Sequence, residues 1–103
     1  MIFFTTETIH GKEIKETLGT VRGSTVRARN IGRDFFAGLK NIVGGEISEY
    51  TQLLADSREQ AIKRMIDDAN KLGADAVVNV SFTTSNVMQG AAEILAYGTA
   101  VKF

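Results

Sequence analysis

One long amphipathic segment, residues 47–72, limits what this chain can fold into more than any other feature. Its apolar residues recur at near-3.6 spacing and form a single face: Ile47, Tyr50, Leu54, Ala61, Met65, Ala69 and Leu72. Gly73 follows at once, and glycine ends helices because it adopts the left-handed conformation at little cost. The pattern predicts a helix over 47–72 whose apolar face must be covered by another layer.

Segments of β-forming residues flank this helix on both sides. A short strand over 2–5 and a longer one over 13–28 are expected before it, and strands over 74–84 and 91–103 after it. Gly19 and Gly23 interrupt the second segment and predict a bulge or the close approach of another backbone. Residues 85–90 are the expected connection, so the last two strands should form an antiparallel hairpin.

Alternation assigns the strand side chains to faces. Leu18 is expected beside Arg22, on the face opposite Val21. One face of the 74–84 strand should hold Ala76, Val78, Val80 and Phe82. In the last strand one face is nearly free of bulk, so a helix or sheet could pack closely over Ile94, Ala96, Gly98 and Ala100.

Residues 31–43 carry a second, shorter helical pattern. Its main apolar face is formed by Ile31, Phe35, Leu39 and Ile42. Phe36 and Val43 make a second apolar line away from that face. A short helix that is apolar on two sides needs two covering surfaces, which a 103-residue domain does not readily supply. We therefore expect Phe36 and Val43 to contact a partner chain.

The order of the predicted elements is β-β-α-α-β-β. Strands and helices are segregated rather than alternating, so the fold class is α+β, with a mainly antiparallel sheet packed against two helices. The length of 103 residues fits a single domain, 1–103.

Charge and composition narrow the functional classes. Residues 1–45 carry seven basic and four acidic groups, and residues 46–103 carry five and eight, so the halves are +3 and −3. This balance disfavours nucleic-acid binding, which usually needs a basic domain, and suits contacts between the two halves or between copies. There is no signal peptide and no apolar run long enough to span a membrane, so a cytoplasmic location is expected.

Four arginines lie within the stretch 21–34: Arg22, Arg27, Arg29 and Arg33. Guanidinium groups fork onto phosphate or carboxylate, and a helix that begins near Asn30 would add free N–H donors. Arg27, Arg29 and Arg33 are therefore candidate ligands of an anion. The alternative is that they pair with the acid-rich half or with a neighbouring subunit, and Arg22, further back on the strand, belongs to a separate contact.

Several motifs in order along the chain resemble one family. They are "TTETIHG", "LGTVRG", "GLKNIVGGEISEYTQLL", "LGADAVVNVSF" and "AAEILAYGTAVKF". Together they resemble the YbjQ-like family, a bacterial and archaeal group labelled as heavy-metal-binding, over essentially residues 3–103. The resemblance implies a small α+β subunit that assembles into a ring-shaped homopentamer, and it implies no established reaction.

This chain has few side chains that could bind a heavy metal. Heavy metals prefer thiolate and imidazole ligands, and this chain has no cysteine and one histidine. A site would need His10 with a carboxylate such as Glu7, or His10 side chains from several subunits of a ring. No nucleophile elbow accompanies the single histidine, so no catalytic residue is assigned.

The expected function is therefore that of a homopentameric binding or scaffold module rather than an enzyme. Two alternatives stay open: anionic small molecules bound at subunit junctions, and heavy-metal binding. A metal ion is the one cofactor that the resemblance raises, and copies of the same chain are the expected partner.

Overall fold

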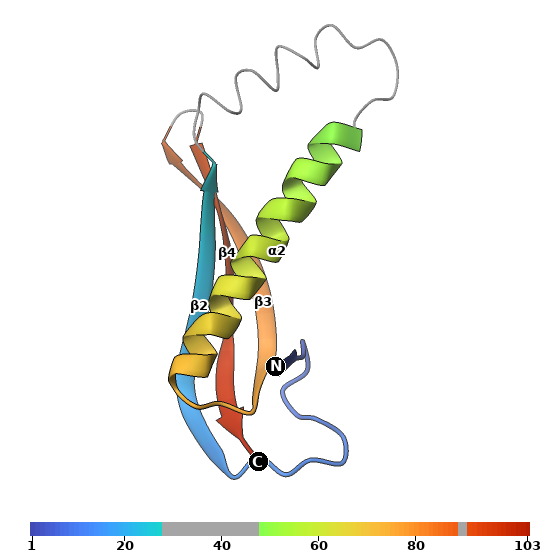
Figure 1. The fold of residues 1–103 in the computed structure, drawn as a ribbon, viewed down its shortest axis with the longest axis vertical. Coiled ribbons are helices and arrows are strands. Elements are labelled where there is room, and N and C mark those ends of the chain that lie inside the picture. Colours follow the sequence, from blue (N-terminus) through green and yellow to red (C-terminus); the bar gives the residue numbers. More distant parts are fainter. Residues whose placement is uncertain (28–47, 89–90) are drawn as a thin grey trace, which may run out of the picture.

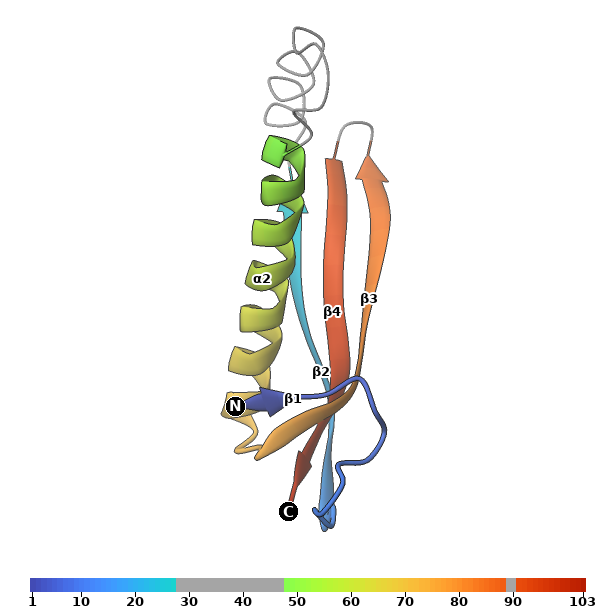
Figure 2. The ribbon, with the colours of Figure 1, turned by 90° about the vertical axis from the view of Figure 1, so that its right-hand side faces the viewer.

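A long helix packs across one face of a four-stranded sheet in the computed structural model (Figures 1 and 2). The structure describes residues 1–27, 48–88 and 91–103, and the side chains of 1–26, 54–85 and 93–103. Its elements are β1 (Ile2–Phe3), β2 (Glu16–Arg27), α2 (Ser48–Lys71), β3 (Ala76–Met88) and β4 (Ala91–Lys102). The helix predicted over 31–43 lies outside the described residues.

The sheet has the order β1-β3-β4-β2. β3 and β4 form an antiparallel hairpin and β4 pairs antiparallel with β2, whereas the two-residue β1 runs parallel to β3. The α+β class and the antiparallel hairpin are thus confirmed, and the sheet is mixed only at β1. The prediction of a connection over 85–90 was wrong, because β3 continues to Met88 and stays paired with β4 up to Ala91.

Helix α2 ends as its sequence predicts. Gly73 has a φ of 73°, and its N–H donates to the carbonyl of Asn70. The N–H of Ala74 donates to the carbonyl of Ala69, which completes a Schellman motif and satisfies carbonyls that the helix end would leave free. The chain then turns directly into β3.

Two irregularities move side chains to faces other than those predicted. The register of β2 shifts between Thr17 and Gly19, where Gly19 has a φ of 134°. Leu18 consequently packs with Val21 under α2 and not beside Arg22. The prediction of a bulge at Gly19 was right, but the prediction for Leu18 was wrong because a bulge inserts one residue into the alternation.

A second bulge, in β3, was not predicted. The register with β4 shifts between Val78 and Ser81, and Asn79 has a φ of 54°. Val77 and Val80 therefore face α2, whereas Ala76 and Val78 face the opposite side of the sheet. Strict alternation had placed Val78 and Val80 on one face, which is wrong.

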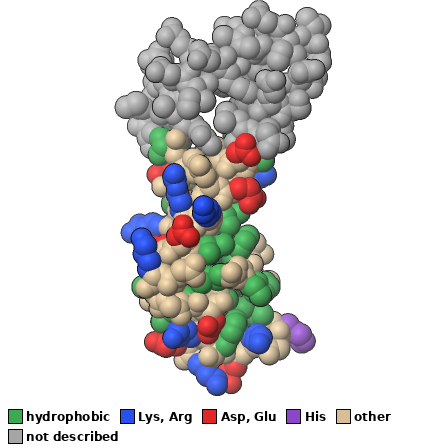
Figure 3. Space-filling model, in the orientation of Figure 1, with side chains coloured by type: hydrophobic (Ala, Val, Ile, Leu, Met, Phe, Trp, Pro, Cys, Tyr) green, Lys and Arg blue, Asp and Glu red, His purple; other side chains and the backbone are tan. Residues whose placement is uncertain are grey.

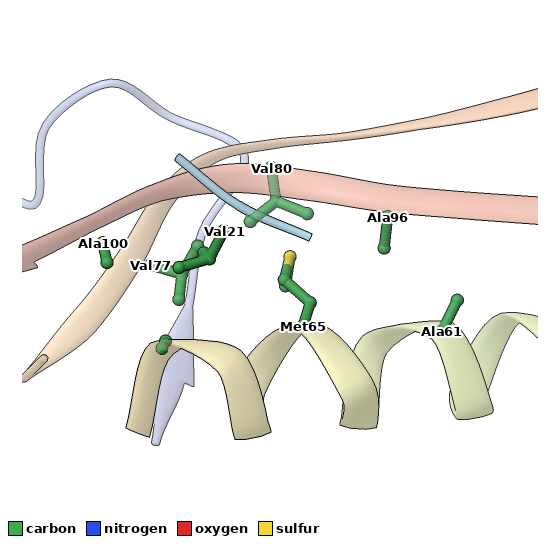
Figure 4. Packing of buried hydrophobic residues seen from close by; sticks show 8 residues of the cluster. Val21, Ala61, Met65, Val77, Val80, Ala96 and Ala100 are labelled. Atoms are coloured by element: carbon green, nitrogen blue, oxygen red, sulfur yellow. The ribbon is translucent and has the colours of Figure 1, made fainter. Parts of the chain in front are cut away.

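The core under α2 is built from small residues (Figure 4). Met65 extends from the helix towards the sheet, among Val21, Val77 and Val80, and Ala61 faces Ala96. A Cβ atom placed on Gly23 would lie 2.2 Å from the backbone nitrogen of Met65. The small face of β4 and the glycine of β2 thus let the helix backbone approach the sheet, as predicted.

The N-terminal segment covers part of the opposite face of the sheet (Figure 2). Ile9 and Ile14 pack against a second cluster formed by Ala76, Val78 and Val101. Further along the strands no described segment covers this face, and Val26 and Tyr97 are 52% and 38% exposed there. The sheet therefore has one face covered by the helix and one face covered only in part.

Candidate functional site: a charged cleft between helix and edge strand

Five charged residues line an open cleft of about 370 Å³ between α2 and β2. Arg22 comes from β2, and α2 contributes Arg64, Asp67, Asp68 and Lys71. Figure 3 shows basic and acidic side chains gathered together on this side of the molecule. Three basic and two acidic residues give the lining a net charge of +1.

Two hydrogen bonds join the walls of the cleft. The backbone N–H of Arg22 donates to Oδ2 of Asp68 at 3.1 Å, and the guanidinium of Arg64 donates to the carbonyl of Ser24 at 2.5 Å. β2 is an edge strand, and Arg22 and Ser24 are two residues apart, so these groups point outwards from the same edge. The side chains of Asp68 and Arg64 therefore form hydrogen bonds with backbone groups of β2 that have no strand partner.

The remaining charges of the cleft are available to a ligand. Asp67 and Lys71 are exposed, and among the described residues neither forms an ion pair. Lys71 also lies in the last turn of α2, where its positive charge suits the negative end of the helix dipole. Basic side chains in this arrangement can hold an oxyanion such as a phosphate or a carboxylate.

Sequence reasoning missed Arg64 and Lys71 as site residues. The signal was present, because Arg64, Asp68 and Lys71 follow each other at spacings of four and three and so share one face of the helix. The spacing of these residues could not show that this face of the helix meets the edge of β2. Asp68 is partly buried and accepts a hydrogen bond from the Arg22 amide, which its place on the helix did not indicate.

The predicted anion-binding arginines lie wholly or partly outside the described residues, so they stay a prediction. Arg27 is the last residue of β2, and its side chain lies outside the described part. Arg29 and Arg33 lie outside the described part entirely. Phe36 and Val43, predicted to contact a partner chain, also lie outside the described residues. The backbone amide of Arg22 contacts Asp68, and the separate contact expected for its side chain stays a prediction.

The predicted metal ligands, Glu7 and His10, lie in the exposed segment between β1 and β2. Among the described residues, no three His, Cys, Asp or Glu side chains gather closely enough to hold a metal ion. The described side chains thus do not fit a heavy-metal centre within one chain. Glu7 and His10 remain a prediction for an assembly in which several copies contribute ligands.

The fold and cleft define a small α+β domain with one long helix on a four-stranded sheet. The model of a family described as "Putative heavy-metal-binding" matches residues 1–103, and the chain belongs to this YbjQ-like family. No helix in the described residues has the length and apolar character needed to cross a membrane.

Relatives of high identity carry no functional description in their names. A UPF0145 protein of Methanosarcina acetivorans is 63% identical over 99% of this chain and 96% of its own length. A UPF0145 protein of Archaeoglobus fulgidus is 64% identical over 99% of this chain and 94% of its own length. A UPF0145 protein of Psychromonas ingrahamii is 59% identical over 99% of this chain and 97% of its own length.

One solved structure shares the fold. A protein of unknown function of the DUF74 family from Pediococcus pentosaceus superposes with a TM-score of 0.65, covering 100% of this chain and 97% of its own. Its sequence identity of 15% restricts the comparison to the fold.

Proposed function

We propose that this protein is a self-assembling scaffold module in which five copies form a ring. The observation that carries the proposal is the distribution of apolar bulk between the core and the surface. The number five is what the family resemblance implies. The reaction class is left open, because no catalytic constellation among the described residues supports one.

The core formed by the described residues contains little bulk. Its largest fully buried side chains are Met65, Val21, Val77, Val101 and Ser57, and the rest of the core is mainly alanine and valine. None of the aromatic side chains in the described part is buried. Phe3, Phe82, Tyr97 and Phe103 are between 38% and 43% exposed, and Ile2 is 63% exposed.

Such a distribution is the reverse of what a free-standing domain needs. Phenylalanine is among the residues most often buried, and burying one fully is worth roughly 1.5–3 kcal/mol. Hydrophobic side chains also form a continuous band on the face shown in Figure 3. Contiguous apolar surface of this kind marks an interaction site, and copies of the same chain would bury it on association.

The dimensions of the chain support the same conclusion. Its radius of gyration is 16.9 Å, and its extents are 54 × 26 × 17 Å. A compact domain of 100 residues has a radius of gyration of about 13 Å. A long, thin subunit leaves a large part of its surface open, which favours assembly with neighbours.

Light scattering coupled to gel filtration tests the proposal. The wild-type protein is expected to elute as an assembly, and Phe82→Ser is expected to weaken it. Phe103→Ser is the matched control and should weaken assembly less, because Phe103 is of similar exposure but Lys12 already lies over its ring, with Nζ 5.4 Å from the ring centroid. A wild-type monomer at micromolar concentration would refute self-assembly.

Anion binding in the cleft is the second candidate function. It is favoured by the meeting of Arg22, Arg64 and Lys71 around one open space. The ligand would carry a phosphate or carboxylate group. If Arg27, Arg29 and Arg33 act in the same way, they do so at a junction between subunits.

Heavy-metal binding rests on the description of the family alone. In this chain it would require His10 and Glu7 from more than one copy. No step of the proposed function depends on it.

A further inference from the structure

We propose that the outer edge of β3, over Ser81–Met88, pairs with the outer edge of β2 in the next copy. The sheet of one subunit would then continue into the sheet of its neighbour. The inference rests on the proposed self-assembly and names the backbone surface that mediates it. Figure 2 shows β3 at one side of the sheet, beyond the short stretch that β1 covers.

The hydrogen bonds of the N-terminal segment show which backbone groups of β3 point outwards. The N–H of Phe4 donates to the carbonyl of Val77 at 2.8 Å, and the N–H of Val80 donates to the carbonyl of Phe4 at 2.9 Å. Val80 therefore directs its backbone groups away from β4. Because this direction alternates along a strand, Phe82 and Thr84 also direct theirs outwards.

No strand in the described part of the chain takes up these outward groups. β1 ends at Phe3 and pairs only with Ala76 and Val77, and the last bond from its segment reaches Val80. Along Ser81–Met88, by contrast, the outward donors and acceptors have no strand partner among the described residues. Such an edge is a ready template for another strand.

The two edges of the sheet differ in how their outward backbone groups are protected. Proteins protect a free edge with charges, prolines or covering groups. The β3 edge, "SFTTSNVM", has no charged residue and no proline. On β2, Asp68 and Arg64 cover the outward groups of Arg22 and Ser24. The chain closes part of the β2 edge and leaves the β3 edge ready to pair.

The occupant that best fits is β2 of a second copy. The part of β2 before the covered groups, Glu16–Val21, has an outer edge that no described strand pairs. Pairing of two different edges is heterologous, and repeated heterologous contacts close into a ring of any number, including five. Pairing of β3 with another β3 would join copies only in twos. A charged foreign peptide would find no complementary charge on the β3 edge.

Phe82 adds an apolar contact to the same surface. It pairs with Ala96, which lies under α2, so its side chain is on the helix side of the sheet. Helix α2 covers mainly β2 and β4, and Phe82 remains 43% exposed. A strand added at the β3 edge would extend the sheet beside the phenyl ring of Phe82 and bury more of that side chain.

Removal of a single outward N–H tests the inference. Thr84→Pro deletes that donor while leaving the β3–β4 pairing intact, because proline is tolerated where the N–H faces away from the sheet. Thr84→Val, which keeps the N–H, is the control. On β2, Thr20→Pro deletes the corresponding donor, since Thr20 is two residues from Arg22.

Sedimentation velocity, with circular dichroism to verify folding, gives distinguishable results. The inference predicts an assembled wild type and Thr84→Val, and folded monomers for Thr84→Pro and Thr20→Pro. A monomeric wild type contradicts the proposed self-assembly itself. An assembled wild type whose size neither proline changes, or only one changes, contradicts the edge pairing and leaves self-assembly standing.

Hydrogen exchange of the wild-type protein keeps the test decisive if a proline variant fails to fold. Paired amides exchange slowly. The Phe82 and Thr84 amides are expected to be protected to the same degree as amides within the β3–β4 ladder. Rapid exchange of both in an assembled sample would overturn the inference.

Discussion

Gly23 lies directly against the backbone of Met65. A Cβ atom on Gly23 would sit 2.2 Å from the Met65 nitrogen and 2.3 Å from the Ala61 carbonyl oxygen. Helix α2 can therefore rest on β2 only because residue 23 has no side chain. Ala96 of β4, which is opposite Gly23 in the sheet, extends the same small surface.

Gly23→Ala is expected to be strongly destabilising. The atoms that a methyl group would meet belong to the helix backbone, so no side chain can rotate away, and the whole helix must move. Overpacking usually costs about 1–3 kcal/mol, and this site should lie at or above the top of that range. Chemical denaturation followed by circular dichroism measures the free energy of unfolding.

The control for Gly23→Ala is Gly73→Ala. Nothing lies within 4 Å of a Cβ atom at Gly73, but its φ of 73° is strained for alanine. That strain should cost about 1–2 kcal/mol. Equal losses in the two variants would contradict the close packing of α2 on β2.

Thr25→Val tests a buried hydrogen bond between β2 and α2. The Thr25 hydroxyl is buried and donates to the carbonyl of Ser57 at 3.1 Å. Valine has the same shape but no donor, so we expect a loss of about 1 kcal/mol in the free energy of unfolding. Thr17→Val, at an exposed position of the same strand, should change it by less than about 0.5 kcal/mol.

Lys71→Ala tests the cleft as an anion site. Phosphate, raised at constant ionic strength, should increase the melting temperature of the wild type, because ligand binding stabilises the folded state. The increase should shrink in Lys71→Ala. Arg58→Ala removes one exposed positive charge from α2 outside the cleft and should retain the full increase. No increase in the wild type, or equal increases in all three proteins, would exclude a phosphate site in the cleft.

Helix α2 and the hairpin of β3 and β4 could be predicted because their signals are local. The apolar face of α2 repeats over many turns, and Gly73 marks its end, so α2 was placed within one residue at each end. The small residues of β4 also predicted that a helix would pack closely there. These features depend on residue type and spacing alone.

The side-chain faces of β2 and β3 could be predicted only in part. Glycine at position 19 indicated a bulge, but no local pattern determined which residue would be inserted, so Leu18 was placed on the wrong face. Asn79 gave no warning, although asparagine tolerates a positive φ better than most residues. One inserted residue reverses every later assignment in the strand.

The cleft could not be predicted because it joins distant parts of the chain. Arg22 and Asp68 are 46 residues apart, and they meet because β2 is an edge strand and α2 crosses it. The spacing of Arg64, Asp68 and Lys71 defines a helix face but not its neighbour. Tertiary packing, which the local pattern does not encode, decides that contact.

Native mass spectrometry of the wild-type protein tests the central claim of self-assembly most directly, because it counts the copies. The chain mass is 11.2 kDa, so a ring of five copies should give five times 11.2 kDa, or 56 kDa. A spectrum of the untagged protein dominated by 56 kDa at micromolar concentration is the predicted result. A spectrum dominated by 11.2 kDa under the same conditions would contradict the account.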